Sequence, residues 1–185
     1  SKWKKILPNK FEAIKVEKNT FSERIVGLIR KINLPIGLHK LICKLLSKKI
    51  RLMNNSNCSY IIFPSQEDEC GNIQLNSITI IHDLMHRYEG RFEEYNDLEY
   101  KKRELCFKRI CKYSNKIIVD SPIGKKHVME SYNCKSNKIS VLPFTTPKYL
   151  ENSKFIDIYK KYKIPKKKFI FYPAQFWEHK NHEII

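Results

Sequence analysis

The sequence predicts an α/β fold in which helices flank a parallel, doubly wound sheet. Four short apolar runs alternate with longer segments of helical periodicity. The runs are rich in β-branched residues and apolar at consecutive positions, which is typical of strands buried on both faces of a parallel sheet. Strands and helices that alternate at this spacing form βαβ units. The four runs are Tyr60–Phe63, residues 78–81, Lys116–Val119 and residues 138–142.

The N-terminal part of the chain is helical in pattern. Between residues 22 and 53, apolar residues recur at i, i+3, i+4 spacing, and Pro35 with Gly37 divides the segment into two helices. We expect the apolar stripes to cover the sheet. The stripes comprise Ile25, Leu28, Ile29, Leu38, Leu41, Ile42, Leu45 and Leu46. The other faces carry Arg24, Arg30, Lys31, Lys40, Lys44, Lys48, Lys49 and Arg51. Residues 11–17 alternate weakly, as in a strand.

Two further helices flank the third run. Residues 98–113 form a basic helix with Cys106, Phe107, Ile110 and Cys111 on one side. The second helix has Ser121 as its N-cap and Pro122 in the first helical position, and it continues to about residue 132.

Composition limits the class of protein but does not decide it. The chain has 185 residues, 42% of them hydrophobic and 12% aromatic, which is enough for a core and excludes wholesale disorder. Its net charge of +17 has three explanations. It would suit a nucleic-acid partner, or an anionic membrane or phosphorylated substrate. It would also follow from AT-rich coding, which enriches Lys, Ile and Asn together.

The cysteines and the hydropathy indicate a cytoplasmic protein. Six cysteines occur without a CxxC pair, so we expect free thiols rather than a disulfide scaffold. No apolar run approaches the ~18 residues that a membrane span needs, and no secretory signal is visible.

Polar residues follow the predicted strands, where ligands bind in open α/β sheets. His82 and Asp83 follow the second run, and Asp120 and Ser121 follow the third. His82 and His86 are spaced for a zinc pair, but a third ligand is not evident. A buried histidine and a substrate-contacting histidine are the alternatives. Asp83 could hold an imidazole in one tautomer, bond a sugar hydroxyl or cap a helix.

The end of the chain predicts another strand-to-helix junction. Residues 169–172 are apolar, and Asn181 could cap a following helix whose free N–H groups would attract an anion. Lys180 adds a full positive charge beside it. An ordinary loop with a solvated lysine is the alternative interpretation.

Four segments in this order resemble family 4 glycosyltransferases of the GT-B fold, especially bacterial enzymes that build surface polysaccharides. They are ITIIHDLMHRYEGRFEE, RELCFKRICKYSNKIIVDSPIGKKHVMESY, KISVLPF and FIFYPAQFWEHKNHEII. The likeness runs from about residue 60 to residue 185. It implies a Rossmann-like acceptor-side domain over residues 1–147, an interdomain linker over 148–168, and the first strand and helix start of a nucleotide-sugar domain over 169–185. The linker is rich in Lys and Tyr and is expected to hold a short helix.

The resemblance also implies an activity and a site. Family members transfer a sugar from a nucleotide-sugar donor with retention of configuration and usually without a bound metal. By this likeness His82 and Asp83 are the catalytic candidates at the sugar end of the cleft. Donor-binding residues would be Ser121, Lys125, Gln175, Lys180 and Asn181, and Lys180 would pair with the donor diphosphate. Mannose is a candidate sugar, and the acceptor would be a saccharide or a lipid-linked acceptor.

The likeness is incomplete in two respects. Many relatives have arginine where Gln175 stands, and the family's paired glutamates and first Gly-rich turn are not in this sequence. We therefore expect the chain by itself, truncated at both ends of the family pattern, to be inactive. The basic helices could hold the enzyme peripherally on the inner face of an anionic membrane, or could only carry solvated lysines. The alternative function is a basic nucleic-acid-binding α/β module, although no recognised nucleic-acid motif is present.

Overall fold

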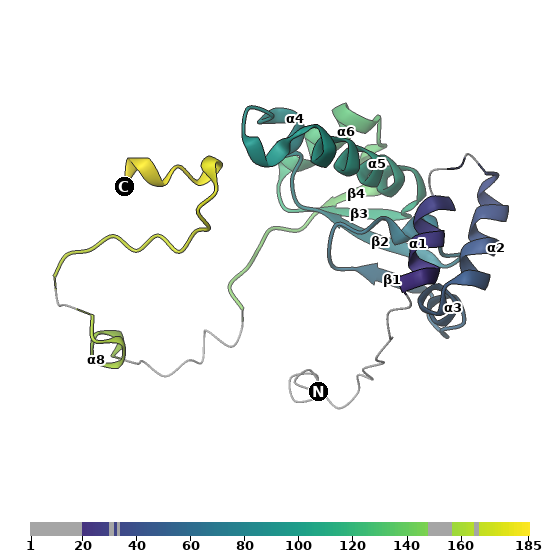
Figure 1. Cartoon of the computed structure of the whole chain (residues 1–185), viewed down its shortest axis with the longest axis horizontal. Helices are drawn as coiled ribbons and strands as arrows, with labels where there is room; N and C mark the ends of the chain where they lie inside the picture. The colour runs from purple at the N-terminus through teal and green to yellow at the C-terminus, as the bar shows by residue number, and fades with distance from the viewer. Residues whose placement is uncertain (1–19, 30–31, 33, 148–156, 165–166) are drawn as a thin grey trace. The chain divides into compact units, whose positions relative to one another are not determined.

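The computed structural model describes residues 20–29, 32, 34–147, 157–164 and 167–185 (Figure 1). The strands are β1 (Tyr60–Phe63), β2 (Asn76–Ile81), β3 (Lys116–Val119) and β4 (Ile139–Val141). The helices are α1 (Thr20–Ile29), α2 (Ile36–Leu46), α3 (Lys48–Asn54), α4 (Met85–Tyr88), α5 (Asp97–Tyr113), α6 (Pro122–Tyr132) and α8 (Ile158–Tyr162). The predicted strand at residues 11–17 lies outside the described residues.

The four strands form one parallel sheet in the order β1-β2-β3-β4, flanked by helices. The predicted α/β, Rossmann-like fold class is therefore confirmed. β1 and β3 have the bounds that the sequence predicted, whereas β2 begins two residues earlier and β4 is shorter. By their contacts the residues fall into two compact units, Ser1–Ile80 with Arg109–Lys116, and Ile81–Lys108 with Ile117–Ile185.

In the first unit the strands are covered on one face, and the expectation of burial on both faces is wrong. Phe63 is 4% exposed and its register partner Thr79 is fully buried, whereas Ile62 is 61% exposed. Ile62 pairs with Ile78, which is half-buried on the same side. The face that carries Ile62 is thus left uncovered by the described residues.

Helix α2 of the first unit buries a different face from the one that the sequence predicted. His39 and Cys43 are buried, whereas Leu38, Leu41 and Leu45 of the predicted packing stripe are exposed and Ile42 and Leu46 are half-buried. Ser47 also separates α2 from α3, because its side chain accepts from the N–H of Ile50 and begins a new helix there. The segment therefore contains one more helix boundary than the sequence predicted.

In the second unit α6 packs closely on β3. Val119 and Val128 are fully buried and Ile139 of β4 is 3% exposed. A Cβ on Gly124 would lie at an ordinary contact distance of 3.7 Å from Cβ of Val119 but only 3.3 Å from Oγ of Ser121, so it would crowd the capping hydroxyl rather than the strand.

Residues 169–172 do not form the predicted strand. They lie in irregular backbone, and Ile170 and Phe171 are about three-quarters exposed. An isolated apolar run gains no strand hydrogen bonds without a neighbouring strand, and none pairs with it among the described residues. The assignment of this segment to a second domain stays a prediction. The predicted short helix of the linker is present as α8.

Candidate functional site

The candidate site lies at the carboxyl ends of two neighbouring strands. His82 directly follows β2, and Asp120 directly follows β3. Nδ1 of His82 lies 3.0 Å from Oδ2 of Asp120. The two side chains are 35% and 20% exposed, so the pair is partly buried but open to solvent.

The carboxylate sets the orientation and the tautomer of the imidazole. Because Asp120 accepts the hydrogen of Nδ1, the neutral ring presents Nε2 as an acceptor. Nε2 makes no hydrogen bond to the described residues. The ring of Phe144 stacks on the imidazole at 5.8 Å between centroids and 20° between planes. The arrangement supplies a positioned base or hydrogen-bonding group with an apolar wall beside it.

Asp83 does not hold this imidazole. Its Oδ1 accepts from the backbone N–H of Met85 at 3.0 Å, and Nη1 of Arg103 lies 3.8 Å from the same oxygen. Asp83 thus bonds the first backbone N–H of α4 from the position before the N-cap, which is Leu84, so it is not the N-cap that the sequence offered as one of its roles.

Ser121 and Lys125, two predicted donor-binding residues, both bond backbone groups. Oγ of Ser121 accepts from the N–H of Gly124 at 3.1 Å, which is the predicted N-cap. The ammonium of Lys125 donates to the carbonyl of Ile139 at 3.0 Å and so ties α6 to the start of β4.

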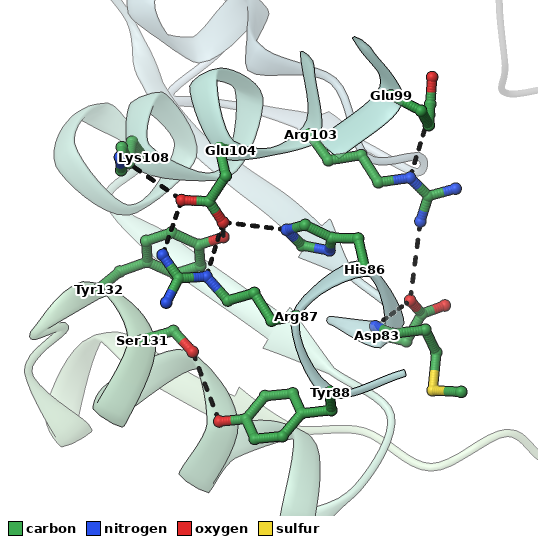
Figure 2. Close-up of polar contacts among 11 residues, drawn as sticks. Asp83, His86, Arg87, Tyr88, Glu99, Arg103, Glu104, Lys108, Ser131 and Tyr132 are labelled. Carbon is green, nitrogen blue, oxygen red and sulfur yellow. Dashed lines mark hydrogen bonds and ion pairs between the residues drawn. The ribbon is translucent and has the colours of Figure 1, made fainter. Parts of the chain in front are cut away.

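A buried carboxylate supports the loop that follows His82 (Figure 2). Glu104 of α5 accepts from Nε of Arg87 at 2.6 Å and from Nη2 at 2.7 Å. It also accepts from Nε2 of His86 at 3.0 Å and from the hydroxyl of Tyr132 at 2.7 Å. One side chain thus joins α4, α5 and α6.

These contacts shift the acid–base properties of the cluster. The Arg87 guanidinium, followed by other donors, lowers the pKa of Glu104 to about 2 against the opposing effect of burial. Burial lowers the pKa of His86, and burial followed by Glu104 raises the pKa of Tyr132. Glu104 is therefore ionised and His86 neutral near pH 7.

His82 and His86, which have the spacing of a zinc pair, are not brought together as a ligand set. His82 bonds Asp120, whereas His86 bonds Glu104. Within the described ranges no group of three or more His, Cys, Asp or Glu side chains is placed to hold a metal ion. His86 is the buried, hydrogen-bonded histidine that the sequence offered as an alternative.

Of the predicted donor-binding residues in the C-terminal segment, Lys180 ends a short 3₁₀ turn, Asn181 follows it, and Gln175 lies in irregular backbone. Asn181 has φ of 49° and joins the turns Glu178–Lys180 and His182–Ile184, where no long helix begins. Gln175 and Lys180 are exposed. A hollow of about 560 Å³ beside this segment is lined by Arg91, Phe92, Phe176, Trp177, Glu178, His179, Asn181, His182 and Glu183.

A paired histidine and glutamate hold this segment to the loop before α5. Nδ1 of His179 lies in close hydrogen-bond contact with Oε1 of Glu94. No contact between described residues joins Lys180 to His82. The structure therefore brings together His82 with Asp120 and, separately, Asn181 with the hollow.

The sequence placed Asp120 directly after the third predicted strand but did not pair it with His82, and Phe144 was not among the predicted site residues. Asp120 takes the same position after β3 that His82 takes after β2. Phe144 gave no comparable signal, since it lies three residues beyond the end of β4.

Comparison of the chain with protein-family models, curated proteins and solved structures found no match.

Proposed function

We propose that this chain is the acceptor-side part of a retaining glycosyltransferase that uses a nucleotide-diphosphate sugar. The observation that carries the proposal is the hydrogen bond between His82 and Asp120 at the strand ends. Ligands of open α/β sheets bind at this edge, and an oriented, partly exposed imidazole suits recognition of a sugar hydroxyl. The order of motifs from His82 to Asn181 supports the same class.

In the proposed reaction the bond between the anomeric carbon and the diphosphate breaks. A bond to the acceptor oxygen forms, and the acceptor hydroxyl gives its proton to an oxygen of the departing diphosphate. His82 would bond a donor-sugar hydroxyl through Nε2, with Asp120 fixing its ring. Lys180 would stabilise negative charge on the leaving diphosphate. No metal is required in this scheme, and mannose and a lipid-linked saccharide remain the candidate sugar and acceptor.

The proposal is tested with the product of the complete gene, a panel of nucleotide sugars and a membrane extract as acceptor source. We expect release of nucleoside diphosphate from one donor, with a large loss in His82→Ala and in Lys180→Ala. His127→Ala and Lys168→Ala are the matched controls, and both should stay near wild type. Absence of release from every donor would contradict the proposal.

A further inference from the structure

Helix α2 exposes three of its leucines and buries His39 and Cys43. Leu38, Leu41 and Leu45 are 46%, 47% and 66% exposed, whereas His39 is 4% exposed and Cys43 is fully buried. Positions i, i+3 and i+7 share one face of a helix, so the three leucines form a continuous outward stripe. The helix lies against α1 and α3 in the first unit (Figure 1).

A buried polar network fixes this orientation. Nε2 of His39 lies 2.9 Å from Oδ1 of Asn72, which also accepts from Nη2 of Arg109 at 3.0 Å. Nε of Arg109 in turn donates to Oδ2 of Asp68 at 2.7 Å. Rotating α2 to bury its leucines would break these bonds and leave buried polar groups without partners, which is costly. The outward stripe is therefore a fixed feature of the fold.

The surface around the stripe is cationic. Residues 36–54 contain no Asp or Glu but hold Lys40, Lys44, Lys48, Lys49 and Arg51. Lys49 is paired with Glu67 and Glu69. Lys40 and Lys44 lie one helical turn apart along one flank of the leucine stripe and make no ion pair with the described residues.

We propose that this leucine–lysine face, defined by Leu38, Leu41, Leu45, Lys40 and Lys44, docks on a bilayer containing anionic lipid. An interfacial helix buries apolar residues at the boundary of the acyl chains, while flanking lysines contact anionic headgroups. Among the described residues no helix is long and apolar enough to cross a membrane. A second copy of the same face fits less well, because its unpaired cations would meet like charges. The inference does not depend on the proposed transferase activity.

The test uses the full chain and sedimentation with vesicles of phosphatidylcholine, with and without phosphatidylglycerol. We expect binding to the anionic vesicles only. Leu41→Gln/Leu45→Gln should weaken partitioning at least about tenfold, because less apolar area is buried. Leu98→Gln/Leu105→Gln, which changes two exposed leucines of α5, is the matched control and should bind as wild type.

A second pair of variants distinguishes the effect of Lys40 and Lys44 on vesicle binding from the effect of the overall net charge. Lys40→Gln/Lys44→Gln should weaken binding about 10- to 30-fold. Lys101→Gln/Lys135→Gln removes the same two charges from exposed positions elsewhere, taking the net charge from +17 to +15, and should weaken it less than about threefold. Circular dichroism melts confirm that all variants fold.

Three results would overturn the proposal. The first is equal binding to neutral and anionic vesicles, or none. The second is an equal loss in the face variants and their controls. The third is a dimer in velocity sedimentation that Leu41→Gln/Leu45→Gln dissociates, which would assign the face to a second copy.

Discussion

Glu104 is the side chain on which the loop after His82 depends most. Its carboxylate is only 10% exposed and accepts from Arg87, His86 and Tyr132. Lys108, one turn further along α5, lies 3.4 Å from its second oxygen. A buried carboxylate is tolerated only when it is paired and hydrogen-bonded in this way. We therefore expect loss of this carboxylate to destabilise the packing of α4, α5 and α6 together.

Glu104→Gln should destabilise the fold by about 3–5 kcal/mol, because it removes one partner of a buried ion pair and leaves Arg87 uncompensated. Urea unfolding followed by circular dichroism measures the effect. Glu130→Gln is the control: its ion pair with Lys126 at 3.8 Å is exposed, so its loss should cost less than about 1 kcal/mol. Equal costs for the two variants would refute the assigned role of Glu104.

The free energy of unfolding should fall as the solution is acidified. His86 has a lowered pKa in the folded state, so below its ordinary value of 6.5 the unfolded chain binds the additional proton. Glu104 has a folded pKa of about 2 against 4.5, so its stabilisation is complete above 4.5 and is lost as the pH falls towards 2. Unfolding curves at several pH values should show that the free energy of unfolding of the wild type falls between pH 4.5 and pH 2. In Glu104→Gln this fall should be smaller. An unchanged fall would exclude Glu104 as its source.

Individual site residues could be predicted where a local rule applied. Ser121 was predicted as an N-cap from its neighbours alone, and its bond to Gly124 confirms this. The partner of His82 could not be chosen in the same way, since Asp120 lies 38 positions away and Asp83 is adjacent. Only the register of two strands decides between these carboxylates.

Among the helices, α6 is the one whose bounds the sequence predicted best. Ser121 caps its start, Pro122 occupies the first turn, and Asn133 ends it at φ of 49° in the left-handed region that asparagine tolerates. Helix α2 was predicted neither in extent nor in orientation, because the predicted helix continued to residue 53 without the break at Ser47. Periodicity identifies a stripe, whereas the direction that the stripe faces depended on the bonds of His39 to Asn72.

Ser121→Ala should destabilise the fold by about 1 kcal/mol, because the N–H of Gly124 loses its acceptor. Ser121→Asn, which can also cap, should recover most of the loss. Thermal unfolding provides the comparison, with Ser136→Ala at an exposed position as the control. A change as large for Ser136 as for Ser121 would contradict the capping argument.

Across the whole molecule, the order β1-β2-β3-β4 follows from strands that alternate with helices along the chain. That alternation was visible in the sequence, and so was the edge at which His82 and Asp120 meet. The uncovered face of β1 was not, because consecutive apolar residues such as Ile61, Ile62 and Phe63 favour burial on both sides. A run of four apolar residues cannot reveal how many faces have a covering layer.

The central claim is that Asp120, rather than Asp83, positions His82 for sugar transfer. The most direct test compares nucleoside diphosphate release by Asp120→Asn and Asp83→Asn in the product of the complete gene. Asn at position 83 can still accept from the N–H of Met85, so this variant should stay within about threefold of wild type. Asn at position 120 no longer fixes the tautomer of the imidazole and should slow release by about tenfold or more. A slow Asp83→Asn beside an unimpaired Asp120→Asn would contradict the account.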